Sequence, residues 1–158
     1  MTKVYVALGA NLDDPKSQLD NACKELIKLA EDGSFQVSSY YRSKPIGDVV
    51  QPDYINAVAS FVTKLAPLAL LDELQRIELE QGRQRLVRWG PRTLDLDLLL
   101  YGNQRFDIPR LTIPHYGLQE RSFVLIPLYE LTPNLCLPCD TKINQLITPQ
   151  MNDELEII

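Results

Sequence analysis

The alternation of apolar and polar positions predicts a strand followed by a helix at the start of the chain. Val4–Leu8 is apolar at every position and is followed by Gly9–Asn11, a pattern typical of a central strand buried on both faces. Apolar residues then recur at helical spacing from Leu19 to Ala30. Asp14, which is followed by proline, is the expected N-cap of this helix, and Gly33 is its expected end.

The pattern continues with two strands, a second helix and a further strand. Phe35–Arg42 and Tyr54–Thr63 are rich in aromatic, β-branched and hydroxyl residues, which favour strands. Pro67 begins a helix with an apolar stripe, which Gly82 is expected to end. Leu94–Tyr101 then predicts another strand.

This order of elements predicts an α+β fold with a ferredoxin-like βαββαβ core, in which helices pack on an antiparallel sheet. A C-terminal extension follows, with short helical pieces expected near Val124–Leu131 and Ile143–Ile147. No linker or repeat divides the chain, so we expect one domain over residues 1–158. The long loops 43–53 and 82–93 are expected to act as lids, because loops of this length are usually functional.

Composition narrows the classes of partner. The formal net charge is -5, which argues against general binding to nucleic acid or to anionic membranes. No apolar run is long enough to cross a bilayer and the start of the chain lacks a signal-peptide layout, so a cytoplasmic location is expected. The cysteines are odd in number: Cys23 fits the core, and the Cys136-x-x-Cys139 pair lacks the setting of a redox motif and is expected to be inert.

The segment Leu94–Leu98 alternates leucine with aspartate. On a strand the leucines share one face, and Asp95 and Asp97 share the other. Two such carboxylates lie roughly 7 Å apart and repel each other, unless a divalent cation is held between them. Magnesium suits this arrangement, because it takes one or two carboxylates together with phosphate oxygens and water. A solvated strand face is the simpler interpretation of an isolated Asp-x-Asp.

The loop that precedes these aspartates favours the metal site. Arginine is the preferred planar donor for phosphate oxygens, and phosphoryl transfer needs mainly positioning and positive charge. A solvated basic loop or a nucleic-acid patch are the alternatives, but neither explains the aspartates that follow. The basic residues of the loop are Arg83, Arg85, Arg88 and Arg92, and Trp89 lies among them.

Other polar residues carry weaker signals. Gln75 and Glu78 are spaced to share a polar face of the second helix. His115 is the only histidine, and a lone histidine is more often structural than catalytic. Neither a P-loop nor a Gly-x-Gly-x-x-Gly sequence is present, so ATP binding would use another architecture.

Four stretches together resemble the 6-hydroxymethyl-7,8-dihydropterin pyrophosphokinase family of folate biosynthesis. The resemblance runs from about Val4 to Pro138, and its most specific block is Arg-Trp-Gly-Pro-Arg-Thr-Leu-Asp-Leu-Asp. It implies a ferredoxin-like fold and transfer of a pyrophosphoryl group from ATP to the pterin hydroxymethyl group, giving AMP. The stretches are Ala7–Leu12, Gln51–Ala57, Arg88–Asp97 and Leu111–Tyr116.

The resemblance also implies roles for particular residues. Asp95 and Asp97 would hold two magnesium ions, with Asp97 also assisting deprotonation, and Arg83 and Arg92 would grip the phosphates. Tyr54 and Phe123 would sandwich the pterin, and Asn56 would bind its edge. Further pterin-pocket positions are Ser43, Lys44, Ile46 and Trp89. The ATP positions are Gln75, Glu78, Arg85, Trp89, Arg92, Leu98, Arg110, Leu111, Thr112, His115, Tyr116 and Arg121.

Two alternatives stay open at this point. A related enzyme would keep the metal–nucleotide chemistry and act on another heterocycle. A ferredoxin-like RNA-binding module would use an aromatic sheet face and a basic loop, although the acidic balance and the two aspartates speak against it. We expect a monomer whose partners are small molecules, ATP and the pterin, rather than nucleic acid or membrane.

Overall fold

The computed structural model describes residues 1–12, 14–44, 50–81, 94–115 and 117–158. Residues 45–49 of the first predicted lid loop and all of the second, 82–93, therefore lie outside the described residues. The same is true of Gly82 as the end of the second helix. Predicted site residues outside the described part of the chain are Ile46, Arg83, Arg85, Trp89, Arg92 and Tyr116.

The first strand and helix lie where the sequence places them. β1 spans Thr2–Ala10 and α1 spans Pro15–Ile27, with Asp14 at the N-cap position. The carboxylate of Asp14 accepts a hydrogen bond from the Ser17 hydroxyl rather than from a backbone N–H. The prediction that Gly33 ends the helix is wrong, because after Ile27 the chain tightens into bonds between residues three apart, a common way for a helix to end.

The predicted strand Phe35–Arg42 is divided into two short strands, β2 (Gln36–Val37) and β3 (Tyr41–Ser43). Val37 pairs with Ala59 and Tyr41 pairs with Asn56. The segment from β2 to β3 therefore contains one residue more than the stretch of β4 that it faces. Ser38 fills the irregularity: its N–H donates to the Val58 carbonyl, and its hydroxyl accepts from the Val58 N–H. A bulge of this kind interrupts a ladder without leaving backbone groups unpaired.

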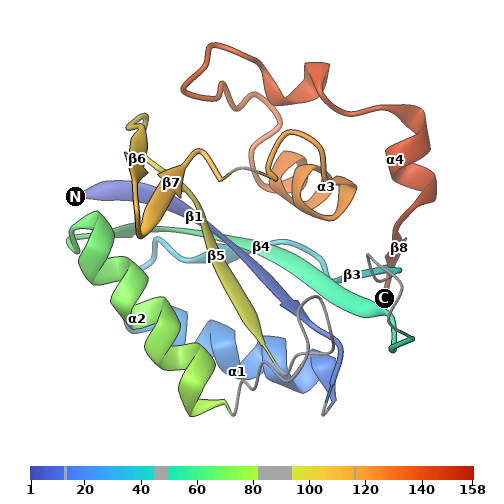
Figure 1. Ribbon diagram of the computed structural model, residues 1–158, viewed down its shortest axis with the longest axis horizontal. Coiled ribbons are helices and arrows are strands. Elements are labelled where there is room, and N and C mark those ends of the chain that lie inside the picture. The colour runs from blue at the N-terminus through green and yellow to red at the C-terminus, as the bar shows by residue number, and fades with distance from the viewer. Residues whose placement is uncertain (13, 45–49, 82–93, 116) are drawn as a thin grey trace.

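The remaining core elements complete the predicted order. β4 spans Tyr54–Thr63, α2 spans Pro67–Glu80 and β5 spans Asp95–Tyr101. The strands lie in the order β5-β1-β4-β3-β8, with β2 also beside β4, and every pairing is antiparallel. This arrangement is the ferredoxin-like sheet that the element order predicts, and its strands run side by side in Figure 1.

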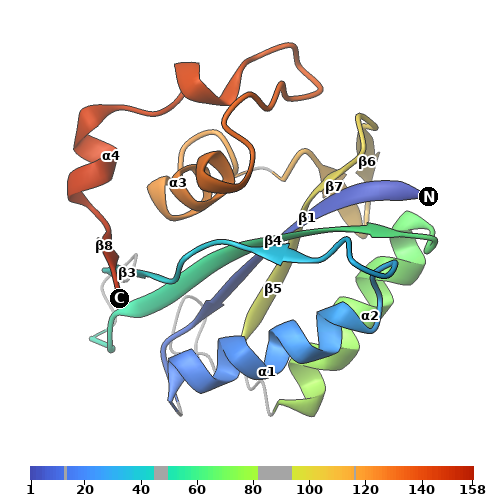
Figure 2. The same ribbon diagram turned by 180° about the vertical axis from the view of Figure 1, so that it is seen from behind.

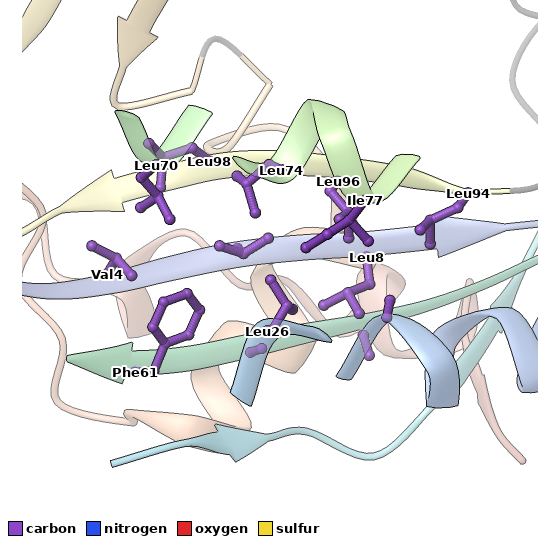
Figure 3. Packing of buried hydrophobic residues seen from close by; sticks show 14 of the residues in the cluster. Val4, Leu8, Leu26, Phe61, Leu70, Leu74, Ile77, Leu94, Leu96 and Leu98 are labelled. Atoms are coloured by element: carbon purple, nitrogen blue, oxygen red, sulfur yellow. The ribbon is translucent and has the colours of Figure 1, made fainter. Parts of the chain in front are cut away.

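Helices cover both faces of this sheet. Figures 1 and 2 show α1 and α2 on one face and α3, Ser122–Leu131, on the other. Against α1 and α2 the sheet is apolar: Leu70, Leu74 and Ile77 of α2 pack toward β5 and β1 (Figure 3). A second apolar cluster lies under α3 and includes Tyr5, Val58 and Leu125. Each layer therefore supports the sheet independently.

The C-terminal extension contains the two predicted helical pieces, α3 and the short helix η1 at Ile143–Gln145. It also contains elements that the pattern did not predict. These are the hairpin of β6 (Phe106–Ile108) and β7 (Leu111–Ile113), the helix α4 (Pro149–Asp153) and the strand β8 (Glu156–Ile157). Within the described part of the chain, no helix combines the length and apolar character needed to cross a membrane.

Candidate active site

Strand pairing gathers the predicted site on one face of the sheet, the face that also carries α3. Asp95 pairs with Gly9, which pairs on its other side with Asn56. In the next row of this face, Asp97 pairs with Ala7. Because directly paired residues point to the same side of a sheet, the two predicted metal-binding acids and the predicted pterin-binding amide lie in adjacent positions across three strands.

Asn56 is held in place by its neighbours. Its side chain is buried, and its Nδ2 donates to the Ser43 hydroxyl over 2.6 Å. A Cβ atom at Gly9 would lie 3.3 Å from the Asn56 Oδ1 atom, so the absence of a side chain at Gly9 makes room for this amide. Tyr54 pairs with Ser43 on the same face. Three predicted pterin-site residues, Ser43, Tyr54 and Asn56, are thus brought together.

A β-bulge in β5 follows the two acids. The pairing of β5 with β1 shifts between Tyr5 and Val6, which leaves Leu99 without a direct partner on β1. Leu98 faces the core under α2, whereas Leu100 faces α3. The carbonyl of Leu99 accepts the His115 backbone N–H over 3.2 Å. The bulge therefore fixes His115 beside the strand that carries both aspartates.

His115 is oriented as a neutral donor toward Asp97. The Gly117 N–H donates to Nδ1 of His115, so the proton of a neutral ring is on Nε2, which lies 4.0 Å from an Asp97 carboxylate oxygen. Burial lowers the pKa of His115 to about 4, Arg121 acts in the same direction and Asp95 opposes them. The ring is therefore neutral at physiological pH and can donate a hydrogen bond without adding charge.

The donors on this face fit a magnesium ion that is shared with a phosphate ligand. Asp95 and Asp97 are both half-buried, and 44% of the Asp97 side chain is exposed, so both carboxylates remain accessible. Among the described residues, no group of three or more His, Cys, Asp or Glu side chains gathers as a metal cluster. The fit to magnesium therefore rests on the two carboxylates alone, since this ion takes one or two carboxylates together with phosphate oxygens and water.

Asn11 and Gly117 have structural roles that the sequence did not predict. The buried Asn11 amide donates to the Gln51 side chain and to the Pro52 carbonyl, over 2.8 and 2.9 Å. It thereby joins two of the stretches that carry the family resemblance. At Gly117, a Cβ atom would lie 2.5 Å from Nε of Arg121, so a larger residue there would require the flexible Arg121 side chain to move. Side-chain chemistry gives no signal for a role that depends on a missing Cβ.

The prediction that Gln75 and Glu78 share a polar face is wrong. Glu78 is buried, and its carboxylate accepts the Leu96 backbone N–H over 2.8 Å at the edge strand β5. Among the described strands none lies beyond β5, so the acid satisfies this donor at the edge of the sheet. Gln75 is exposed and accepts a hydrogen bond from Arg110, which also forms an ion pair with Asp72.

The other predicted ATP positions are divided between the core and the surface. Leu98 and Leu111 are buried in the core under α1 and α2, so only their backbone groups are available to a ligand. Thr112 is exposed on β7, and Lys44, a predicted pterin-pocket position, is exposed beyond β3. Arg121 precedes α3, and its guanidinium carbon lies 5.7 Å from the centre of the Phe123 ring. Arg121 and Phe123 are therefore neighbours at the start of α3.

Cys23 and Cys139 pack against the apolar clusters on opposite faces of the sheet. Cys23 packs against the core, as predicted, and burial raises the pKa of its thiol. In the hairpin after α3, the Thr141 side chain lowers the pKa of the Cys139 thiol, and Gln119 also donates to its sulfur. That Cys136 and Cys139 are inert stays a prediction.

Comparison with known proteins places the chain within a family. Residues 5–133 match the family described as 7,8-dihydro-6-hydroxymethylpterin-pyrophosphokinase (HPPK). The chain is 54% identical over 147 residues to a Haemophilus influenzae 2-amino-4-hydroxy-6-hydroxymethyldihydropteridine pyrophosphokinase, covering 93% of this chain and 92% of that protein. It is 52% identical over 145 residues to the Pseudomonas aeruginosa protein of that name, covering 92% and 90%.

Solved structures show a similar fold. A Plasmodium falciparum HPPK-DHPS crystal structure with pterin and p-hydrobenzoate superposes with a TM-score of 0.74. The match covers 99% of this chain but only 48% of that chain, so the present chain spans less than half of it. At 12% identity the likeness concerns the fold alone.

Proposed function

Because the chain belongs to the 7,8-dihydro-6-hydroxymethylpterin-pyrophosphokinase family, we propose that it transfers the pyrophosphoryl group of ATP to the hydroxymethyl group of 6-hydroxymethyl-7,8-dihydropterin. The products are AMP and the pterin diphosphate, in folate biosynthesis. One structural observation supports the proposal at the level of residues. Asp95, Gly9 and Asn56 occupy directly paired positions on three neighbouring strands. That row sets a metal-binding acid beside an amide suited to the edge of a pterin.

The pterin binds over the part of this face formed by β3 and β4. Asn56 offers donors and an acceptor to the ring edge, and its bond to Ser43 fixes which way the amide points. Tyr54 and Phe123 supply flat aromatic surfaces for stacking, and both are half-buried. Lys44, Ile46 and Trp89 complete the proposed pocket.

The triphosphate lies along β5 and beside His115. Asp95 and Asp97 hold two magnesium ions, which supply positive charge against the triphosphate and against the charge that develops during transfer. His115 donates its Nε2 proton in a hydrogen bond to a phosphate oxygen, because Gly117 keeps that nitrogen the protonated one. Arg83, Arg92 and Arg121 add positive charge, and Gln75, Glu78, Arg85, Leu98, Arg110, Leu111, Thr112 and Tyr116 complete the nucleotide site.

The transfer is one displacement at the β-phosphorus. A bond forms between the acceptor hydroxyl oxygen and this phosphorus, and the bond from the phosphorus to the bridging oxygen of AMP breaks. Asp97, whose side chain is partly exposed on the reacting face, accepts the hydroxyl proton. The remaining residues position the two substrates, because phosphoryl transfer depends mainly on alignment and charge.

We further propose that residues 1–158 form one domain that acts as a monomer in the cytoplasm, without nucleic acid or membrane partners. The net charge of -5 supports this, because an acidic chain is repelled by phosphodiester backbones and anionic lipids. Size-exclusion chromatography with light scattering tests the monomer, and a dimer mass would contradict it.

Product analysis tests the reaction directly. The protein is incubated with ATP, 6-hydroxymethyl-7,8-dihydropterin and magnesium, and the nucleotides are separated. AMP in equal amount with the pterin diphosphate is expected, and chelation of magnesium should stop its formation. ADP with a pterin monophosphate would indicate transfer of a single phosphoryl group and would overturn the proposal.

A further inference from the structure

The C-terminal segment 149–158 lies outside the residues that match the family and connects two elements of the proposed site. β8 pairs with β3, and the Ile158 N–H donates to the Tyr40 carbonyl. At the other end of the segment, α4 contacts α3. Figure 2 shows the chain passing from α4 beside α3 to β8 at the edge of the sheet. The family match spans residues 5–133 and does not include this segment.

The first turn of α3 depends on this segment for an acidic partner. Among the described residues, the N-cap Arg121 makes no side-chain capping bond, and the first turn of α3 contains no acid. Ser122, its first residue, is buried, and its hydroxyl donates to the Glu154 carboxylate over 2.8 Å. A carboxylate beside a helix N-terminus is stabilising, because it opposes the positive end of the helix dipole. Glu154 therefore supplies, from the C-terminal segment, the carboxylate that the first turn of α3 lacks.

Ser122 lies between two residues of the proposed site. Arg121 precedes it and rests on Gly117, the residue whose N–H binds His115. Phe123 follows it and contacts Arg121 through its ring. A shift of this turn would move the proposed pterin-stacking ring and the proposed phosphate-binding arginine together. The Glu154 bond is thus placed to set the geometry of both substrates' contacts.

We propose that Glu154 is a positioning residue for this reaction, which acts through Ser122 to hold Arg121 and Phe123 in their binding orientation. This inference rests on the proposed function, since it assumes that these two side chains contact ATP and the pterin. The alternative is that the tail only stabilises the fold, as the exposed Arg42–Glu156 pair at 3.4 Å would do on the same segment.

The test compares Glu154→Ala with the matched control Glu156→Ala. Removing Glu154 should raise the KM for both substrates about threefold to tenfold, with kcat within about twofold of wild type. Ser122→Ala should do the same, and the double variant should add little, because both changes remove one bond. Glu154→Gln, which keeps an acceptor oxygen, should restore part of the loss. Glu156→Ala should leave both KM values unchanged.

Three results would overturn the inference. The first is an unchanged KM in Glu154→Ala, the second is an equal rise in Glu156→Ala, and the third is full additivity of the double variant with Ser122→Ala. Thermal unfolding of every variant separates a loss of folding from a loss of positioning, since a structural role would lower Tm without separating KM from kcat. A wild-type protein that forms no AMP would instead refute the proposed function, and this inference with it.

Discussion

The two faces of the sheet are built by different means. On the face under α1 and α2, most buried residues of the strands are apolar, and Leu70, Leu74 and Ile77 are fully buried (Figure 3). On the opposite face, α3 covers an apolar cluster, while Asn56, Asp95 and Asp97 lie where the strands continue beyond it. The first face stabilises the fold, and the second combines stability with polar chemistry.

This difference separates residues that stabilise the sheet from residues that are proposed to bind substrates on it. A mainly apolar face gains free energy from the methylenes that it buries and depends little on exact polar geometry. The mixed face keeps two carboxylates close together, which costs free energy unless a cation or a donor compensates them. Substitutions on the first face should therefore act on stability, and substitutions on the second should act on binding or rate.

The largest effect is expected from the carboxylates. Asp95→Asn or Asp97→Asn should lower kcat at least about 1,000-fold, equivalent to about 4 kcal/mol, because each change removes charge that holds the metal. The urea midpoint should not fall, since like-charge repulsion is relieved. Asp107→Asn, at an exposed position on β6, is the control and should retain full activity. A loss of stability that matches the loss of rate would contradict the division between the faces.

A core substitution should show the opposite behaviour. Leu74→Ala empties a fully buried position under the sheet and should lower the free energy of unfolding by about 3 kcal/mol. The kcat of the folded protein should be retained at low temperature, because the change is on the other side of the strands from the acids. Leu79→Ala, on the same helix but 70% exposed, should cost little. Urea titration and steady-state assays at two temperatures measure both quantities.

The same contrast explains what the sequence predicts well. Helical spacing identified the stripe of α2, and alternation identified Asp95 and Asp97 as sharing a face of β5, because both signals are local. The bulge at Leu99 is not local: it depends on pairing with β1 and on the N–H of His115. Strict alternation would place Leu98 and Leu100 on one face, whereas they belong to opposite clusters.

The site shows a similar limit. From the sequence alone, a charged residue such as Glu78 is expected at the surface. Its carboxylate is instead buried and accepts a backbone N–H of β5, a partner that only the tertiary structure supplies. Gly117 contributes a backbone N–H to His115 and space to Arg121, and neither property depends on a side chain. Residue type therefore predicted the acids and the aromatics, while the elements that orient them required the fold.

A smaller effect on activity is expected at Gly9, which lies between Asp95 and Asn56 in the sheet. Gly9→Ala places a Cβ atom 3.3 Å from Oδ1 of Asn56, so the amide that is bonded to Ser43 must shift slightly. The KM for the pterin should rise about tenfold, equivalent to about 1.4 kcal/mol, with a smaller change in stability. In an Asn56→Ser background the shorter side chain removes the close contact, and Gly9→Ala should then add nothing. An equal rise in both backgrounds would show that Asn56 is not what the new methyl group displaces.

The smallest effect is expected on stability, at the hydrogen bond that joins α3 to the sheet face that carries the site. The buried Tyr41 hydroxyl donates to Glu130 of α3, and burial together with this carboxylate raises the pKa of Tyr41. Because the folded pKa is the higher one, the stabilising contribution is complete below the ordinary tyrosine value of about 10 and is lost as the pH rises above it. Tyr41→Phe should lower the free energy of unfolding by about 1 kcal/mol at pH 8, and the difference from wild type should shrink by pH 11.

Urea titrations at both pH values measure this difference, with Tyr129→Phe on the exposed side of α3 as the control. A difference that stays constant with pH would show that the hydroxyl proton is not shared with Glu130, and that apolar packing alone fastens α3 to the face that carries the site.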